Sequence, residues 1–326
     1  MAYAYIPVTI TNSESTATPT DFQQLVTVDL SYYSAFLNQD LSNTFFSSDT
    51  AGSTVVTSWL ESGNTYPFNS VNFWLYLPDG IGASSSITVY LQVDLSGANH
   101  FNDTTTGVAP QLTSTYAEYD DGANVFTNYW NFAGTTAPSD WTYNAGSISY
   151  NNGVTFNSTA SGSFWYYTGA TYSGNLMIDE LMKVNTQGLN GEGAVGLTTT
   201  TPSWTSTFSA ALVYNNTIPK LGIIYLGTDG DTAAEFEPVG TFGILGFSAT
   251  SSGMEIYSNY QKISSSTDAV PSSYYIVGSE ASAGAQVFIQ WLRTRAYPPS
   301  GVMPSVSAGT PSNFPYYNTT TYEDLL

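Results

Sequence analysis

Apolar and polar residues alternate with a period of two along most of the chain, whereas apolar residues at helical spacing are scarce. Successive side chains of an extended strand point to opposite faces, so this alternation is typical of strands with one buried face. Clusters of Gly, Asn, Asp and Pro separate these segments and mark turns. The pattern therefore predicts an all-β fold. We expect one short helix at 32–41 and strands at 5–10, 24–30, 55–60, 72–77, 86–95, 147–150, 154–157, 176–184, 193–198, 208–214, 221–226, 240–247, 254–260, 274–277 and 286–297.

A polar stretch at 102–111 divides these strands into two groups. We expect a small β-sandwich module at 1–110 and a larger sandwich at 111–300, because turns every ~8–15 residues favour two packed antiparallel sheets. In the larger module, Asn151-Asn152-Gly153 predicts a tight hairpin, since Asn and Gly tolerate positive φ angles. Residues 301–326 are rich in Pro, Ser, Thr and Tyr, and we expect them to form an extended tail.

Charge and composition exclude several classes of function. The 326 residues include 5 Lys or Arg and 25 Asp or Glu, and Lys183 is the first basic residue. A net charge of −20 provides no means of neutralising phosphates, so we expect no nucleic-acid partner. The absence of Cys and the presence of a single His exclude thiol nucleophiles, cysteine-ligated metals and His-based metal triads. A surface of hydroxyls and amides suits an acidic exterior, and a secreted protein of neutral surroundings is the alternative.

Targeting signals and membrane spans are not expected either. Residues 1–7 have no basic n-region, and Pro7 interrupts the early apolar run. The longest apolar stretches, 239–247 and 287–292, are much shorter than the roughly 20 residues that span a bilayer. We therefore expect no membrane insertion. Because the composition suits an exterior, we expect a location on the cell surface, on a virion or outside the cell. The chain is then either trimmed of a leader or exported inside a particle.

Several motifs resemble known surface modules. The motifs Ile6-Pro-Val-Thr-Ile-Thr-Asn12, Phe45-Phe-Ser-Ser-Asp49, Ser58-Trp-Leu-Glu-Ser62 and Phe73-Trp-Leu-Tyr-Leu-Pro78 resemble a small β-module of unknown function in archaeal and bacterial surface proteins. The segments 118–126, 138–141 and 288–304 resemble the concanavalin-like and laminin-G-like sandwich attached to that module in archaeal surface proteins and some archaeal virus proteins. The resemblance implies a concanavalin-like jelly roll in the second module. It further implies attachment, surface coating or glycan recognition, with no family-wide catalytic residues.

Catalysis has little support in the sequence. Retaining glycosidases need two carboxylates about 5 Å apart, and the Glu-x-Asp-x-x-Glu pattern that supplies them on a concanavalin-like fold is absent. Glu235 and Glu237 share a strand face, but Pro238 follows them, and we expect a solvated strand end. The adjacent residues Asp179 and Glu180 must point to opposite faces. We therefore expect no catalytic residues, and a secreted glycoside hydrolase or carbohydrate-binding module on a concanavalin-like fold is the alternative.

Ligand binding is better supported than catalysis. Exposed aromatic rings are platforms for sugars, and the candidates are Trp165 with Tyr167, or Trp204 with Tyr214, with plain packing or subunit contact as the alternative. No cofactor is required, although closely spaced carboxylates allow calcium at Asp229 and Asp231, in an expected tight loop, or at Asp120 and Asp121 beside Asn124. Ordinary Asp-Gly turns are the alternative to a calcium site.

Two further groups of residues bear on the surface. Arg293 and Arg295 lie on one face of a strand and either bind an anion or pair with carboxylates of the neighbouring strand. The sequence pattern Asn-x-Ser/Thr gives four candidate N-glycosylation sites, Asn102, Asn157, Asn215 and Asn318.

Together these features predict a non-catalytic structural or adhesion protein of an archaeal exterior. It would be a cell-surface protein or a spike, fibre or capsid component of a virion. The expected partners are other copies or other surface subunits, together with cell-surface glycans. The strand at 4–10 and the Pro-rich tail are the segments expected to complete a neighbouring subunit's sheet.

Overall fold

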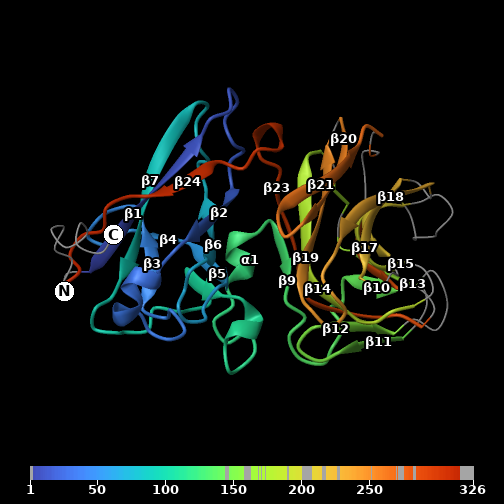
Figure 1. Cartoon of the computed structure of the whole chain (residues 1–326), viewed down its shortest axis with the longest axis horizontal. Coiled ribbons are helices and arrows are strands. Elements are labelled where there is room, and N and C mark those ends of the chain that lie inside the picture. Colours follow the sequence, from blue (N-terminus) through green and yellow to red (C-terminus); the bar gives the residue numbers. More distant parts are fainter. Residues whose placement is uncertain are drawn as a thin grey trace. The chain divides into compact units, whose positions relative to one another are not determined.

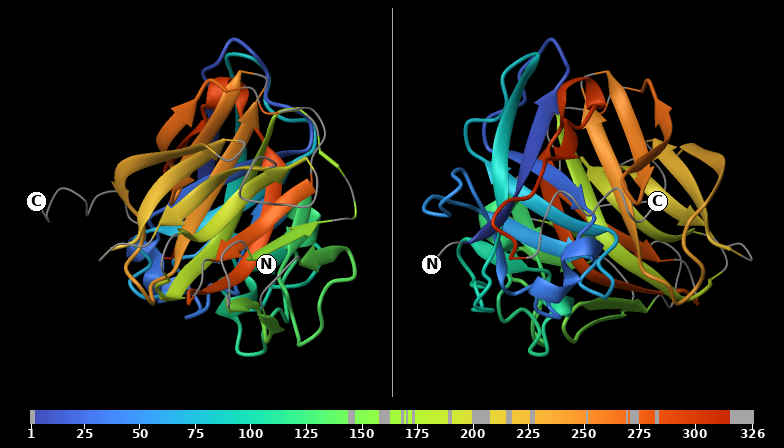
Figure 2. Two further views of the ribbon diagram at one scale, coloured as in Figure 1. Left: turned by 90° about the vertical axis from the view of Figure 1, so that its right-hand side faces the viewer. Right: turned by 60° about the vertical axis from the view of Figure 1, so that its left-hand side comes forward.

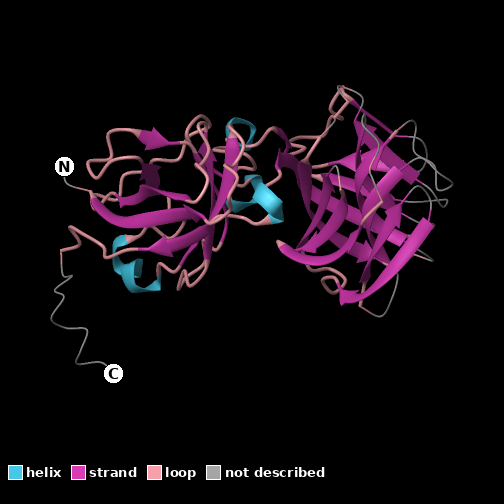
Figure 3. Cartoon of the chain, turned by 90° about the horizontal axis from the view of Figure 1, so that it is seen from above, coloured by secondary structure: helices cyan, strands magenta, loops and turns pink. Residues whose placement is uncertain are grey.

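The structure is a computed structural model, and it describes residues 3–143, 147–157, 163–167, 169, 171–172, 174–188, 191–199, 208–214, 218–225, 228–250, 252–268, 270, 275–281 and 284–315. Strands dominate the described chain, and its few helices are each a turn or two long (Figure 3). The all-β prediction is confirmed. None of the described helices has the length and apolar composition that crossing a membrane requires.

The chain divides into two compact units. Unit 1 consists of Met1–Phe126 with Pro298–Leu326, and unit 2 consists of Thr127–Tyr297. Residues 111–126, which we expected in the second module, therefore belong to unit 1. They are held there by Phe126, at the end of helix α1 (Gly122–Val125), whose ring packs edge-on against Trp59 at 5.3 Å and Trp74 at 5.7 Å.

Unit 1 contains two sheets, one of five strands and one of four (Figure 1). The predicted strand at 55–60 is divided between them, and the predicted helix at 32–41 is a 3₁₀ helix at Ser31–Phe36. The five-stranded sheet has the order β24 (Ser305–Ala308), β1 (Ala4–Asn12), β7 (Ser85–Val93), β3 (Thr44–Ser47) and β4 (Val55–Val56). The four-stranded sheet has the order β2 (Phe22–Val28), β6 (Val71–Leu77), β5 (Ser58–Ser62) and β8 (Thr106–Val108), and a 3₁₀ turn follows at Pro110–Leu112.

Both described ends of the chain pair within unit 1. Strand β24 runs antiparallel to β1, with Val8 opposite Ala308, and lies beside it in Figure 1. Beyond β24, the Tyr5 amide donates to the Ser312 carbonyl at 3.0 Å. The expectation that these segments complete another subunit's sheet is therefore wrong for the described residues. Strand β1 has no free edge to offer, because β7 occupies its other side.

Unit 2 contains two larger sheets that form separate layers (Figure 2). The seven-stranded sheet has the order β10 (Trp141–Tyr143), β13 (Ser163–Tyr167), β22 (Tyr275–Ala281), β15 (Gly191–Thr198), β16 (Phe208–Tyr214), β17 (Lys220–Tyr225) and β18 (Thr228–Glu235). The eight-stranded sheet has the order β11 (Ser147–Tyr150), β12 (Val154–Asn157), β23 (Gln286–Ala296), β14 (Leu176–Thr186), β19 (Gly243–Thr250), β20 (Gly253–Ser258) and β21 (Gln261–Ser266). Its eighth strand, β9 (Asn128–Trp130), pairs with β23. A 3₁₀ turn at Pro299–Gly301 follows β23.

The predicted hairpin is present in unit 2. It joins β11 to β12, with Tyr150 opposite Val154. Asn152 and Gly153 have φ angles of 53° and 129°, in the region where Asn and Gly are favoured.

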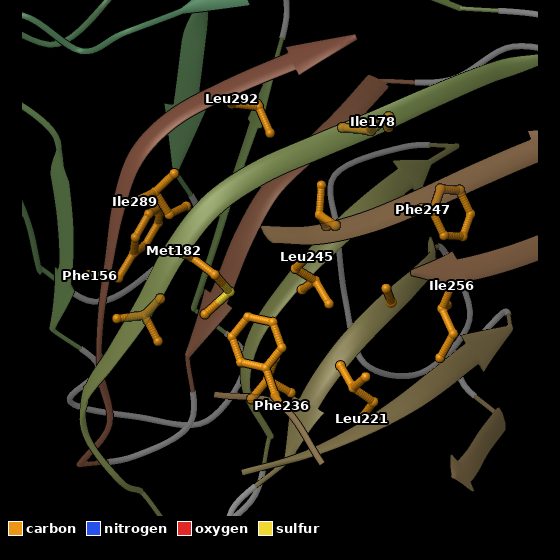
Figure 4. Close-up of a cluster of buried hydrophobic side chains, with 14 of the residues drawn as sticks. Phe156, Ile178, Met182, Leu221, Phe236, Leu245, Phe247, Ile256, Ile289 and Leu292 are labelled. Carbon is orange, nitrogen blue, oxygen red and sulfur yellow. The ribbon is translucent and has the colours of Figure 1, made fainter. Parts of the chain in front are cut away.

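The core of unit 2 lies between its two sheets. Ile178, Met182, Leu245 and Leu292 point into one cluster of apolar side chains (Figure 4).

Glu180 occupies the same face of β14 as Ile178 and Met182, directly between Leu245 of β19 and Leu292 of β23. Its side chain is fully buried, and neither carboxyl oxygen has a hydrogen-bond partner among the described residues. Burial in this apolar surrounding raises the pKa of Glu180 well above its ordinary value.

Candidate functional site

Four aromatic side chains from three separate segments of unit 2 form one cluster, which we call the aromatic cluster. Its members are Trp130, Trp141, Tyr167 and Tyr172. The Trp130 ring centroid lies 5.1 Å from that of Trp141 and 5.1 Å from that of Tyr167, and the Tyr167 and Tyr172 centroids are 6.1 Å apart. These distances are typical of favourable contacts between aromatic rings.

Strand pairing brings the aromatic cluster together. Trp130 ends β9, which pairs with β23 in the eight-stranded sheet and puts Trp130 opposite Leu292. Trp141 and Tyr167 are paired residues of β10 and β13 in the seven-stranded sheet. The cluster therefore joins the two sheets of the sandwich, and its rings pack against the apolar core.

The exposure and polarity of the aromatic cluster suit ligand binding. Trp141 is buried, whereas Trp130, Tyr167 and Tyr172 are only half-buried. Burial, the hydroxyl of Tyr167 and the charge of Asp140 together raise the pKa of Tyr172, so its phenol remains a protonated donor at neutral pH. Partly exposed rings next to hydroxyls and a carboxylate are able to stack on the apolar face of a sugar and to bond its hydroxyls.

The structure brings one of the four predicted platform residues, Tyr167, into this cluster. Trp165 pairs through its backbone with Tyr143 of β10, but its side chain lies outside the described part of the chain, as does all of Trp204. Tyr214 ends β16, which β22 and β15 separate from β13. Its ring packs against Gly222 of β17, where an added Cβ would lie 2.0 Å from the ring. Each predicted pair, Trp165 with Tyr167 and Trp204 with Tyr214, includes one side chain outside the described part of the chain, so both pairs stay predictions.

The expected calcium loop at Asp229 and Asp231 is absent. Both residues lie in β18, where Asp229 pairs with Ile224 and Asp231 with Gly222. Asp and Gly favour turns, but here the main-chain hydrogen bonds to β17 hold Asp229-Gly230-Asp231 in an extended strand. Nor do three or more Asp, Glu or His side chains of the described chain come together as a metal-binding group.

The second predicted calcium pair, Asp120 and Asp121, lies in unit 1 immediately before α1. Asp120 Oδ1 accepts hydrogen bonds from the Trp59 indole nitrogen at 2.8 Å and from the Gly122 amide at 3.1 Å. Asp121 is 1% exposed. Asn124, the expected third ligand, instead donates from its side chain to the Asp103 carbonyl at 3.0 Å.

Two candidate glycosylation sites lie in the described structure. Asn102 holds a turn, because its Oδ1 accepts from the Thr104 and Thr105 amides while its Nδ2 donates to the His100 carbonyl at 2.9 Å. Asn157 ends β12 and accepts a hydrogen bond from Gln286 Nε2 at 2.6 Å. Asn215 and Asn318 lie outside the described residues.

The two arginines of β23 pair with a carboxylate on the neighbouring strand. Arg295 Nε lies 2.7 Å and Arg293 Nε 3.2 Å from Asp179 Oδ2 of β14, and all three side chains are buried. Although burial opposes ionisation of Asp179, the charges of Arg295 and Arg293 keep its pKa below the ordinary value. Arg293 Nη2 also donates to the Tyr260 hydroxyl at 2.6 Å. This group links β14 to β23 and leaves anion binding without support.

Glu235 and Glu237 have different surroundings in unit 2. Glu235 is exposed at the end of β18, opposite Lys220. Glu237 lies beyond the strand, where the Asn259 side-chain amide donates to its Oε1 at 2.9 Å. Asp179 and Glu180 point to opposite faces of β14, as expected.

Comparisons with known proteins give one related sequence and several similar folds. No protein-family model matches the chain. Over 124 residues, which are 38% of this chain, the sequence is 44% identical to "Uncharacterized protein 562" of Sulfolobus islandicus rod-shaped virus 1. The match covers 21% of that viral protein.

Similar solved structures include a carbohydrate-binding module, a lumenal domain solved with a bound sugar and a GH43 protein. The carbohydrate-binding module CBM66 from Bacillus subtilis is 18% identical, with a TM-score of 0.37 over 48% of this chain and 96% of its own. The VIP36 exoplasmic/lumenal domain, solved with Ca²⁺ and Man3GlcNAc, is 14% identical, with a TM-score of 0.39 over 51% of this chain and 92% of its own. The GH43 protein BlXynB from Bacillus licheniformis is 12% identical, with a TM-score of 0.42 over 52% of this chain and 39% of its own.

Proposed function

We propose that this protein is a non-catalytic, glycan-recognising component of the exterior of an archaeal virus particle, displayed there in many copies. The observation that carries the proposal is the aromatic cluster, which presents three half-buried rings, two of them phenols, beside Asp140. The relative from a rod-shaped virus supports the viral setting. The placement of Glu235 and Glu237 supports a non-catalytic role, because Glu237 is held by an amide and Glu235 lies exposed at an edge strand.

The charge around the aromatic cluster indicates which sugars it takes. All four rings come from residues 130–172, a stretch with no Lys or Arg, and Asp140 is the charged side chain that influences Tyr172. A sugar carboxylate or sulfate would meet negative charge here with no cation from this stretch to offset it. The site therefore favours neutral sugars, which stack on rings and donate their hydroxyls to a carboxylate.

A glycan array at acidic and neutral pH tests this recognition with the full chain. We expect binding to neutral glycans, and Tyr167→Ala or Trp130→Ala should weaken it by up to about tenfold, since one aromatic contact is worth about 0.5–1.5 kcal/mol. Tyr32→Ala is the matched control, because Tyr32 is 70% exposed and lies in unit 1. Binding confined to acidic glycans, no binding at all, or equal losses in the control would refute the proposed site.

Immunogold labelling of intact source particles tests the location. Regular labelling of the particle surface supports display in many copies. Labelling only after the particles are opened contradicts it.

A further inference from the structure

Asp121 places a carboxyl group in the interior of unit 1. Its side chain is 1% exposed, and neither of its oxygens has a hydrogen-bond partner among the described residues. Oδ1 lies against the backbone of β8, where a Cβ added to Gly107 would be 1.8 Å away. Because a buried carboxyl group without a partner is costly, some neutralising group is expected at this point.

A second carboxylate lies beside Asp121. Asp120 accepts the indole N–H of Trp59, and Trp59 is directly opposite Gly107 in the parallel pairing of β5 with β8. Asp120 is thus hydrogen-bonded to a residue of β5, and Asp121 lies against the residue of β8 that pairs with it. Two carboxyl groups at successive positions of the chain attract positive charge.

Unit 1 cannot supply that positive charge from its own side chains. All Lys and Arg residues of the chain lie between Lys183 and Arg295, which is within unit 2. The single histidine, His100, has its Nε2 2.9 Å from Asp94. Neutralisation in unit 1 therefore comes from a bound proton or from a cation taken from solution.

We propose that Asp120 and Asp121 form a binding site for a hard divalent cation of the calcium class. Such cations accept carboxylate oxygens together with carbonyl and amide oxygens and water, so two carboxylates are enough when the backbone completes the shell. A cation can coordinate the oxygens of Asp121, whereas a proton binds only one of them and leaves the new hydroxyl without an acceptor among the described residues. Gly107 leaves the room that the Asp121 carboxylate occupies.

Terbium luminescence is the direct test, because Tb³⁺ replaces Ca²⁺ and emits when a nearby tryptophan is excited. The indole of Trp59 donates a hydrogen bond to Asp120, so this tryptophan is close enough to transfer its excitation energy to an ion at the site. With chelator-treated full-length protein, we expect saturable emission that excess Ca²⁺ suppresses, and a higher melting temperature of unit 1 on adding Ca²⁺. Asp121→Asn and Gly107→Ala should each lower the Tb³⁺ affinity at least tenfold, the second by displacing the carboxylate. Asp79→Asn, an exposed control in the same unit, should leave the affinity unchanged.

The outcomes separate a cation from a proton. Emission that survives in Asp121→Asn overturns the proposal, because the ion then binds elsewhere on an acidic surface. The absence of saturable emission together with a melting temperature that Ca²⁺ does not change also overturns it, and a proton then neutralises Asp121. Because glycan binding is assigned to unit 2, neither result bears on the glycan proposal.

Discussion

Replacing the core carboxyl group of Glu180 should change how the stability of unit 2 depends on pH. Glu180 is fully buried between Leu245 and Leu292, with no hydrogen-bond partner among the described residues. Desolvation is the cause of its raised pKa, and Lys183, the nearest basic residue along β14, lies over the rings of Phe242 and Phe288 instead. In the native state Glu180 therefore keeps its proton at a pH where the unfolded chain has lost it.

The sign and size of the effect follow from proton linkage. An unfolded Glu has a pKa of about 4.3, so above that pH the native state binds one more proton than the unfolded state. The contribution of Glu180 is fully present in acid. It declines by about 1.4 kcal/mol for each pH unit until the native group ionises, up to about 3 kcal/mol between pH 5 and pH 7.

Two variants isolate this contribution. Glu180→Gln cannot ionise, so it should remove the decline, and Glu180→Leu should in addition make unit 2 more stable than the wild type at pH 7. Urea unfolding is measured at pH 5 and pH 7 through the hydrogen exchange of peptides from β14. This readout reports on unit 2 alone. Glu235→Gln, at an exposed position, is the control and should keep the wild-type decline. If both Glu180 variants also keep it, the carboxyl group is not buried and neutral as described.

Three further substitutions test other parts of unit 2. Asp179→Ala should cost about 3–5 kcal/mol in urea unfolding, because it leaves two buried arginines without their shared carboxylate, and a loss below about 1 kcal/mol would contradict that pairing. Gly153→Ala should lower the melting temperature, since its φ is +129° and an added Cβ would lie 2.3 Å from the Phe288 ring; an unchanged melting temperature would show that the hairpin adapts. Although burial opposes it, donors including a lysine and two tyrosines lower the pKa of Glu255, so its contribution should be present above about pH 4.3 and lost as pH falls through the native pKa. Glu255→Gln should therefore destabilise at pH 7 but not at pH 2, and equal losses at both would refute this.

Sequence periodicity predicted the long strands with a buried face. Strand β1 alternates over nine positions, and the pattern predicts it within a few residues of its observed ends. Strands β14 and β23 are long and rich in apolar residues, and the sequence predicts both within a few residues of their ends. Short strands such as β3, β8 and β24 were missed, since three or four residues do not reveal a period. Their existence depends on partners far away in the sequence, which local pattern does not encode.

The candidate sites were predictable only in part. The sequence indicates Tyr167 as an exposed aromatic residue. It does not indicate Trp130, Trp141 and Tyr172, because the cluster arises from the pairing of β9 with β23 and of β10 with β13. Aromatic residues in each of these short segments were the available signal. The burial of Asp121 depends on Gly107, fourteen residues earlier, and only the fold brings these residues together.

If the proposed function is correct, unit 2 binds neutral glycans through the aromatic cluster. The most direct test of this binding is to titrate the full chain with a neutral glycan selected on the array and to monitor the tryptophan fluorescence. We predict a saturable change in emission in the wild type, up to about tenfold weaker binding by Tyr167→Ala, and unchanged affinity in Tyr32→Ala. No saturable change with any neutral glycan, or the same affinity in Tyr167→Ala as in the wild type, would contradict the account.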